Sequence, residues 1–313
     1  MSQVVPPGAL TAAGLGWQAS GHATLAGPLY RLADACDQAF LALAGLWAAE
    51  PEEHPAMIAA ATLQRVGYLT SFPHQATFPV CLDADPGNLH AFTGSGPVNG
   101  DGVVRLARTA PARDLLTPAA CYHIYPHHEG EQLGSLRYIT TRNTCFRRET
   151  YYEPLRRQWS FRMREIVCLG TRGEVQGFLE HARAAVSLLL RELDLPVRWE
   201  VATDPFFEPA SNPHYLAQVL QPVKHEARFG ADLAIASLNL HEDHFGAAFG
   251  ISREGQPATS GCVAFGIERW LYAIASRHGC DPAAWPDPVA AVRRATGPLA
   301  TADTRMLTEV GRG

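Results

Sequence analysis

The sequence has no run of basic residues, no long apolar window and no closely paired cysteines. Its 26 Lys and Arg residues against 31 Asp and Glu residues give a formal net charge of −5. Nucleic-acid binding depends largely on contacts to phosphates and ordinarily leaves a basic surface. The N-terminus lacks a positive segment followed by an apolar core, and no window reaches the length of a membrane span. We therefore expect a cytoplasmic protein that binds neither nucleic acid nor membrane.

The seven cysteines are scattered, and no CxxC pair occurs among them. Their odd number and spacing argue against a disulfide framework and agree with reduced thiols in the cytosol. Each cysteine taken alone is most simply a small buried side chain. The seven are Cys36, Cys81, Cys121, Cys145, Cys168, Cys262 and Cys280.

Composition and periodicity predict one α+β domain across residues 1–313. With 47% hydrophobic and 18% charged residues, the chain has the balance of a globular protein. Pairs of antiparallel strands interrupted by helices predict a mostly antiparallel sheet flanked by helices. Residues 1–66 are expected to be largely helical, with helices near 29–49 and 55–65. Turn-forming residues dominate 83–102, which is expected to be a loop.

Two helices have clear boundaries in the sequence. Thr171 and Glu174 have the spacing of a capping box, and apolar residues then recur every three or four positions until Pro196. A second apolar stripe predicts a helix from about Gly266 to His278. The shorter elements expected are strands at 197–203 and 233–239 and helices near 214–224 and 289–294.

Residues 143–169, NTCFRRETYYEPLRRQWSFRMREIVCL, predict two strands joined by a basic loop. Arg147 and Glu149 share a face of the first strand, because side chains alternate along a strand. In the second strand, Glu165 is the one carboxylate in an apolar row formed by Trp159, Phe161, Met163, Val167 and Leu169. A buried carboxylate is neutral, paired with a cation or bound to a metal. An ordinary hairpin with Arg/Glu pairs across its strands fits the same pattern.

This stretch and two others resemble a known set of motifs. FRRE at 146–149, followed by Phe161 and Glu165, is similar to motif 2 of the class II aminoacyl-tRNA synthetases, most closely the seryl enzymes. SGCVAFGIERW at 260–270 resembles their motif 3, and GYLTSFP at 67–73 resembles motif 1. The three occur in the family's order. The chain therefore resembles the truncated seryl-tRNA synthetase homologues known as amino acid:[carrier protein] ligases, and we expect the class II antiparallel sheet.

The resemblance also indicates a missing part. A seryl-tRNA synthetase carries a long charged coiled coil near its N-terminus, which grips tRNA. Residues 1–66 contain no heptad repeat and are poor in lysine. We therefore expect no tRNA-binding coiled coil in this chain.

The resemblance implies an ATP site. Arg147 would hold the α-phosphate together with the substrate carboxylate, since a guanidinium fork suits both anions. Glu149 would meet the adenine amino group. Phe161 would stack on the adenine ring, with Arg269 on the other face and reaching the γ-phosphate, while Arg157 would contact the terminal phosphates. Each arginine taken singly fits a surface charge equally well.

Magnesium is expected to accompany ATP, but the sequence does not place it. Seryl enzymes carry a Glu in the strand before motif 3, where this chain has LAIA at 233–236. The ATP phosphates themselves could hold the ion.

The zinc ligands that the resemblance implies are Cys121, Glu165 and Cys262. Two thiolates and a carboxylate would leave the fourth position of zinc open, as in catalytic zinc sites. The α-amino group of a small amino acid would take that position, and glycine or alanine is the expected substrate. Ordinary seryl-tRNA synthetases bind no zinc there. Lys224, in the run QPVKHE, resembles a family position near the substrate.

The resemblance further implies partners for this chain. The acceptor would be the phosphopantetheine thiol of a small acidic carrier protein, and motif 1 implies a homodimer. Residues 205–224 correspond to a docking helix of the family and fit an ordinary connection equally well. Two other functions stay open: aminoacyl transfer to tRNA or another acceptor, and a non-catalytic synthetase paralogue that binds a partner.

Two histidine-bearing runs suggest metal binding of another kind. His123, His127 and His128 follow Cys121 closely, and His241 and His244 flank an acidic pair. For the first run, solvent-facing histidines in a loop are the more common case. The second fits a polar turn better than a hydrolase site, because it lacks the HExxH spacing.

Overall fold

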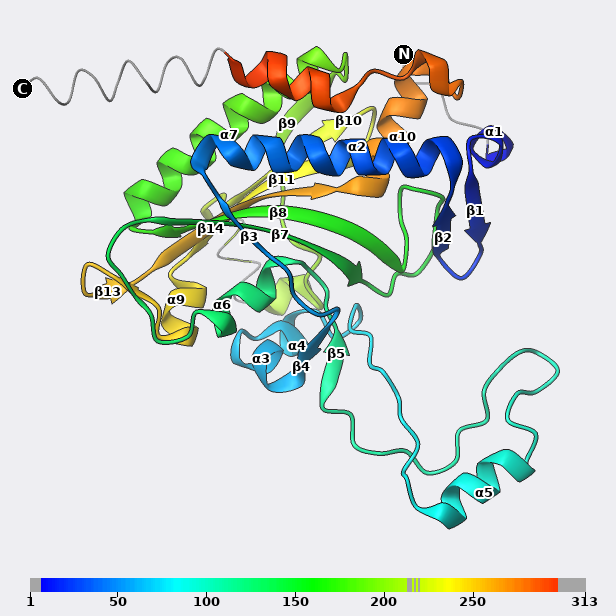
Figure 1. The fold of residues 1–313 in the computed structure, drawn as a ribbon. Coiled ribbons are helices and arrows are strands. Elements are labelled where there is room, and N and C mark those ends of the chain that lie inside the picture. The colour runs from blue at the N-terminus through cyan, green and yellow to red at the C-terminus, as the bar shows by residue number, and fades with distance from the viewer. Residues whose placement is uncertain (1–6, 213–215, 217, 219, 298–313) are drawn as a thin grey trace, which may run out of the picture.

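A seven-stranded sheet forms the centre of the molecule (Figure 1). The computed structural model describes residues 7–212, 216, 218 and 220–297. Neighbouring strands pair antiparallel except at one edge, where β3 runs parallel to β7. The predicted α+β fold is confirmed. In spatial order the strands are β3 (Glu50–Glu52), β7 (Arg137–Phe146), β8 (Ser160–Gly170), β14 (Thr259–Gly266), β11 (Leu233–Glu242), β10 (Lys224–Phe229) and β9 (Val197–Val201).

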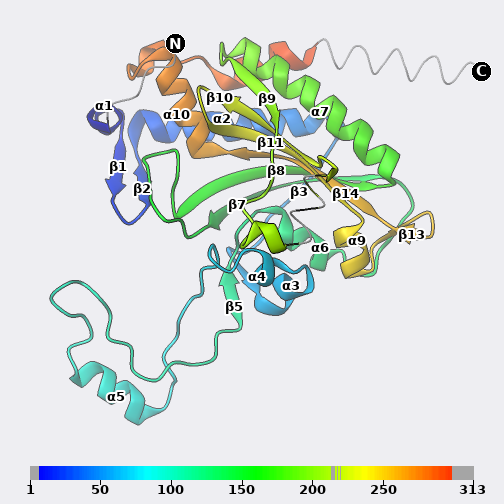
Figure 2. The same ribbon diagram turned by 180° about the vertical axis from the view of Figure 1, so that it is seen from behind.

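Helices cover the two faces of the sheet unequally. The long helices α2 (Gly27–Ala44), α7 (Arg172–Glu192) and α10 (Ile267–His278) lie together over one face, as both views show (Figures 1 and 2). Short helices lie at the opposite face: α3 (Ala60–Arg65), α4 (Tyr68–Ser71), α6 (Ile124–His127) and α9 (His244–Phe249). The predicted helices near 29–49 and from Gly266 to His278 are confirmed.

The alternation of side chains along β8 explains the two faces. Ile166 and Cys168 pack into the core beneath the long helices, whereas Val167 and Leu169 belong to the core of the opposite face. This is the period of two expected of a strand that is buried on both sides. The row predicted to include Glu165 therefore faces the short helices.

Helix α7 begins as its sequence predicts. Thr171 Oγ1 accepts a hydrogen bond from the Glu174 backbone N–H at 3.3 Å, and Glu174 Oε2 accepts one from the Thr171 N–H at 2.7 Å. These are the two reciprocal bonds of a capping box. The helix then lies so close to β14 that a Cβ at Gly261 would come within 2.8 Å of Val175. Glycine at 261 lets helix and sheet approach.

The remaining elements lie around this frame. Residues 288–297 are helical, near the predicted helix at 289–294. A small sheet contains β6, β12 and β13, and two further pairs are β1–β2 and β4–β5. The bounds are α1 (Pro7–Ala12), β1 (Leu15–Gln18), β2 (His22–Leu25), β4 (Met57–Ala59), β5 (Asp114–Leu116), β6 (Gln132–Leu133), β12 (Ser252–Arg253) and β13 (Gln256–Pro257).

Three expectations from the sequence need correction. The region 83–102, expected to be turns throughout, contains helix α5 (Pro86–Gly94), which Asp85 caps and which projects from the molecule (Figure 1). Met57–Ala59 forms β4, so the helix expected near 55–65 is confined to α3. Lys224 begins a strand and does not end a helix, because β10 pairs with β11 from that residue onward. Of the helix expected near 214–224, residues 214, 215, 217 and 219 lie outside the described residues.

Within the described ranges, no helix combines the length and the apolar character that crossing a membrane requires.

Candidate active site

A cavity of about 250 Å³ opens on the face of the sheet that carries the short helices. Strands β8, β11 and β14 form its floor, and α4 contributes Tyr68 to its wall. Phe72, at the end of α4, also lines it, so the segment predicted to be motif 1 borders the cavity. All nine residues singled out from the sequence line this cavity: Cys121, Arg147, Glu149, Arg157, Phe161, Glu165, Lys224, Cys262 and Arg269.

Cys121, Glu165 and Cys262 form a tight group in the cavity. Their donor atoms lie within 4.8 Å of one another, and the three residues are 5%, 2% and 2% exposed. The group forms because β8 pairs with β14, where Glu165 lies opposite Ala264, two residues from Cys262 on the same face. Glu165 Oε1 also accepts a hydrogen bond from the Cys121 backbone N–H at 3.3 Å. Two buried sulfurs and a carboxylate oxygen are a donor set that fits zinc.

The electrostatics of this group favour a cation. The hydrogen bond with Cys262, burial and the Glu165 carboxylate all raise the pKa of Cys121 well above its usual value. At Cys262, the hydrogen bond from Cys121 lowers the pKa, but burial and Glu165 outweigh it and raise the pKa overall. Both thiols therefore hold their protons in the metal-free protein. A bound cation would stabilise the two thiolates and displace those protons.

His241 and Asn239, on β11, both approach Cys262. Asn239 Nδ2 donates to the Cys262 sulfur at 3.3 Å, and His241 Nε2 lies 3.7 Å from it. His241 Nδ1 lies 3.1 Å from each of two hydroxyl oxygens, those of Tyr125 and Ser260. Burial lowers the pKa of His241 to about 4, so the ring is neutral at pH 7. Since both hydroxyls can donate to Nδ1, we assign the ring proton to Nε2, directed at the sulfur.

These two contacts were not predicted from the sequence. His241 attracted notice only as part of a possible hydrolase site with His244, and the described residues contain no metal-ligand group that joins the two. The alternation of polar residues along β11 was the available signal. Ser237, Asn239 and His241 are spaced by two and all line the cavity.

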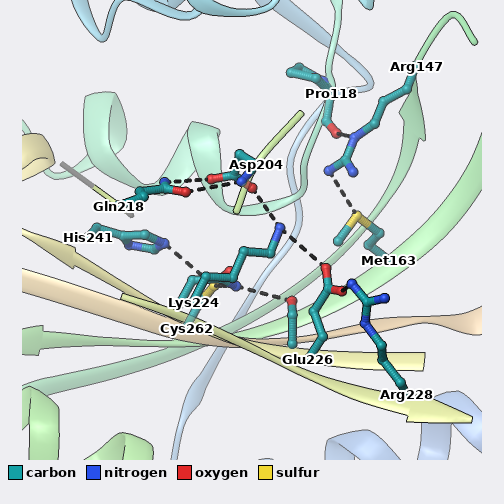
Figure 3. A network of polar contacts seen from close by, with 12 residues as sticks. Pro118, Arg147, Met163, Asp204, Gln218, Lys224, Glu226, Arg228, His241 and Cys262 are labelled. Atoms are coloured by element: carbon teal, nitrogen blue, oxygen red, sulfur yellow. Dashed lines mark hydrogen bonds and ion pairs between the residues drawn. The ribbon is translucent and has the colours of Figure 1, made fainter. Parts of the chain in front are cut away.

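Arg147 follows the end of β7 and is held at the cavity wall. The sequence predicted it inside the first strand with Glu149, but β7 ends at Phe146 and both residues come after it. Arg147 Nε donates to the Pro118 carbonyl at 2.9 Å (Figure 3). Its guanidinium carbon lies 5.4 Å from the centre of the Phe161 ring. Its Nη2 donates to the Met163 sulfur at 3.8 Å, and the residue lines the cavity, where the fork can meet an anion.

The other two arginines predicted to bind the nucleotide also make hydrogen bonds. Arg157 Nη1 donates to Glu149 Oε2 at 2.7 Å. Arg269, in the first turn of α10, donates from Nη1 to the Ala234 carbonyl at 3.0 Å. Burial and the positive charge of Arg147 lower the pKa of Arg269 to about 10. Arg269 keeps its proton at pH 7, and an anion between the two arginines would relieve their repulsion.

Lys224, the single lysine of the chain, takes part in a network at the cavity (Figure 3). Its Nζ donates to Asp204 Oδ1 at 2.6 Å and lies 3.6 Å from Glu226 Oε1. Gln218 Nε2 donates to the other oxygen of Asp204 at 2.9 Å. Burial opposes ionisation of Asp204, but Lys224 and Gln218 outweigh it and lower the pKa of that carboxyl. The sequence indicated Lys224 and gave no sign of Asp204.

The fold is that of the class II aminoacyl-tRNA synthetases. In the crystal structure of Aquifex aeolicus tRNASec with Methanopyrus kandleri seryl-tRNA synthetase, the synthetase matches with a TM-score of 0.76 and 18% identity, over 94% of this chain and 62% of that one. The Cryptosporidium parvum prolyl-tRNA synthetase matches with a TM-score of 0.63 and 14% identity, over 88% of this chain and 52% of that one. At these identities the likeness concerns the fold alone. No protein-family model matches the chain.

Curated relatives define the family more narrowly. The amino acid–[acyl-carrier-protein] ligase 1 of Bradyrhizobium diazoefficiens is 36% identical over 244 residues, which are 75% of this chain and 73% of that protein. Ligase 2 of the same organism is 35% identical over 74% of this chain and 71% of its own length. The type-2 serine–tRNA ligase of Methanopyrus kandleri is 25% identical over 77% of this chain and 50% of its length. The chain belongs to the amino acid–[acyl-carrier-protein] ligase family and is a ligase.

Proposed function

We propose that this protein activates glycine or alanine with ATP as an aminoacyl-adenylate and transfers the aminoacyl group to the phosphopantetheine thiol of a carrier protein. The observation that carries the proposal is the meeting, in one cavity, of two anion-binding arginines and a buried sulfur and carboxylate donor set. The names of the curated relatives support the amino acid and the carrier protein as substrates.

Activation joins the amino acid to the α-phosphate of ATP. A carboxylate oxygen attacks the α-phosphorus, the bond to the β-phosphate oxygen breaks, and pyrophosphate leaves. Arg147 binds the carboxylate and the α-phosphate with one fork and so holds the two reacting groups together. Arg157 and Arg269 neutralise the leaving pyrophosphate. Phe161 stacks on the adenine and Glu149 accepts from its amino group, while the phosphates would hold magnesium.

Cys121, Glu165 and Cys262 would hold zinc, which when bound offers an open position to a free α-amino group. Two bulky side chains line the same cavity as this donor set: the rings of Tyr122 and Phe245 lie 5.7 Å apart, centre to centre. Their bulk supports a substrate with a very small side chain. A steric pocket excludes large side chains more readily than it separates glycine from alanine. Lys224, which donates to Asp204, lines the same cavity and is the proposed further residue near the substrate.

In the transfer step, the carrier thiol attacks the acyl carbon, the bond to phosphate breaks, and AMP leaves. Residues 205–224 are the proposed docking segment. Phe206 stacks on Phe72 beside the cavity, with ring centres 4.9 Å apart. Leu216 and Leu220, four residues apart and each in helical conformation, are 48% and 85% exposed. Spaced by one helical turn, they offer an apolar contact to a carrier protein.

The acceptor distinguishes this function from its rivals. Labelled glycine and alanine are incubated with ATP, the enzyme and one of three acceptors: phosphopantetheinylated carrier protein, the same carrier without the prosthetic group, or tRNA. Label on the first alone is the expected result. Label on tRNA would support the aminoacyl transferase alternative, and label on none would support a non-catalytic paralogue.

The docking segment and the oligomeric state have separate tests. Leu216→Ser/Leu220→Ser should slow transfer to the carrier while adenylate formation continues, and equal loss of both steps would contradict a docking role.

The resemblance to seryl enzymes supports a homodimer. Light scattering should then give twice the mass of one chain.

A further inference from the structure

A second group of metal-binding side chains lies outside the cavity, between the edge strand β3 and helix α6. Glu52 is the last residue of β3, His127 is the last residue of α6, and His128 follows it. One carboxylate oxygen and two imidazole nitrogens of these residues lie within 4.8 Å of one another. None of the three lines the cavity. Both ribbon views show β3 passing close to α6 (Figures 1 and 2).

Glu52 holds the group together. Its Oε1 lies 2.7 Å from His128 Nε2, and its Oε2 lies 2.9 Å from His54 Nε2. A carboxylate with an imidazole nitrogen against each oxygen is bridged by protons in the metal-free protein. A metal ion can replace such a proton, because a neutral imidazole and an ionised carboxylate both offer lone pairs to it.

The ring of His128 has the outer support typical of a ligand histidine. Its Nδ1 lies 3.1 Å from Glu131 Oε2 and 3.0 Å from Arg137 Nη1, which donates to that same carboxylate oxygen at 2.7 Å. Histidines that bind metal almost always donate their second ring N–H to a carboxylate or a carbonyl, which fixes the ring and strengthens the ligating nitrogen. When Nδ1–H donates to Glu131, His128 Nε2 directs its lone pair toward Glu52.

Among the described residues, a buried imidazole nitrogen beside His54 has no hydrogen-bond partner. The ring of His123 stacks on that of His54, with ring centres 5.4 Å apart and planes 12° apart. His123 is 8% exposed, and its Nε2 has no hydrogen-bond partner among the described residues. Buried polar atoms without a partner are uncommon, and an absent ion or water is a usual cause. A water or an ion in this region would give that nitrogen a partner.

We propose that Glu52, His127 and His128 bind a second divalent transition-metal ion, such as zinc. Two imidazoles and a carboxylate are the donor set of open zinc sites, and they favour zinc, cobalt or nickel over magnesium or calcium. The ion fastens the edge strand of the sheet to the turn that begins at Cys121. This site contains no sulfur and is separate from the donor set in the cavity.

Metal stoichiometry tests the proposal. The full chain is stripped with a chelator, reloaded with zinc, freed of excess by gel filtration and analysed for bound zinc. His127→Gln/His128→Gln should hold one equivalent less than the wild type. His90→Gln, a histidine variant on the projecting helix α5, is the matched control and should hold as much as the wild type. Equal zinc in the double variant and the wild type would overturn the proposal.

Cobalt distinguishes this site from the one in the cavity. Cobalt bound by Glu52, His127 and His128 gives visible bands without a thiolate-to-cobalt charge-transfer band. Cobalt in the cavity site has visible bands of its own, so the spectrum of His127→Gln, whose replaced side chain is exposed, is compared with that of the wild type. The bands of the Glu52 site should be missing from it. Their persistence in that variant would contradict the proposal even if the double variant fails to fold.

Glu131→Gln tests whether the contact of Glu131 with His128 strengthens metal binding. It should weaken cobalt affinity at this site by about 10- to 100-fold while keeping the stoichiometry. An unchanged affinity would contradict the role of Glu131 as a positioning residue.

Discussion

Side chains of β8 and β14 point alternately to the two faces of the sheet, and the two faces have different surroundings: one is mainly apolar and the other carries the polar groups of the cavity. Ile166 and Phe265 enter an apolar layer beneath α2, α7 and α10, whereas Glu165 and Cys262 line the cavity. Apolar burial stabilises the fold, but a buried carboxylate costs free energy unless it is paired, hydrogen-bonded or bound to a metal. The face beneath the long helices is therefore mainly stabilising, whereas the other face combines its own apolar core with a site that costs free energy.

The apolar face should be the more sensitive in stability. Phe265 stacks on Phe40 with ring centres 4.3 Å apart and planes 7° apart. Phe265→Ala should lower the free energy of unfolding by about 3–5 kcal/mol, because it removes buried area and leaves a hole. Urea denaturation measures this. Phe265→Leu is the milder control, and no loss of stability in the alanine variant would contradict the assignment of this face.

The cavity face should be the more sensitive in rate. Arg147→Ala should slow amino-acid-dependent pyrophosphate exchange by about 10²- to 10³-fold, because a donor to the transition state is lost. Stability should change little, since the only hydrogen bonds of its side chain within the described residues go to the Pro118 carbonyl and the Met163 sulfur. Arg147→Lys keeps the charge without the fork and should recover only part of the rate. An unimpaired alanine variant would contradict this part of the account.

A substitution at His241 tests the cavity face by its effect on zinc affinity, and the exchange rate is not needed. His241→Phe removes the N–H near the Cys262 sulfur and should weaken zinc binding at the cavity site by about 10- to 100-fold. Competition with a chromophoric chelator measures the affinity. His244→Phe, on the neighbouring helix α9, is the control. Equal affinities of the His241 variant and the wild type would show that the contact has no influence on the metal.

The smallest effect is expected at the start of α7. Thr171→Ala removes half of the capping box and should lower the free energy of unfolding by about 1 kcal/mol, with exchange activity intact. Glu174→Gln is the control, because glutamine can keep the reciprocal bond. A rate loss in Thr171→Ala would show that the stabilising face also sets the geometry of the site.

The parts of the site that the sequence predicted depend on local periodicity. The period of two along 159–169 placed Glu165 in an apolar row, and β8 has that alternation. Motifs 2 and 3 lie on β8 and β14, which are neighbours in the sheet, so Cys262 comes next to Glu165. Of the three residues, Cys121 alone comes from a distant turn. Its prediction as a ligand rested on the resemblance to the family and on no local pattern.

The parts that the sequence missed depend on contacts between distant segments. Asp204 meets Lys224 only because the chain after β9 returns to the cavity opposite the start of β10. His241 reaches Cys262 through the register of β11 on β14, which no local pattern specifies. Helix α5 was missed for another reason, since Gly and Pro near Asp85 suggested turns although Asp-Pro is also a helix start.

Amino-acid-dependent exchange between ATP and labelled pyrophosphate tests the central claim most directly. The assay covers all the common amino acids and compares zinc-replete protein with protein stripped by a chelator. We predict exchange with glycine or alanine that collapses on stripping and returns when zinc is added back. Folded, zinc-replete protein that shows no exchange with any amino acid would contradict the proposal that the chain activates an amino acid.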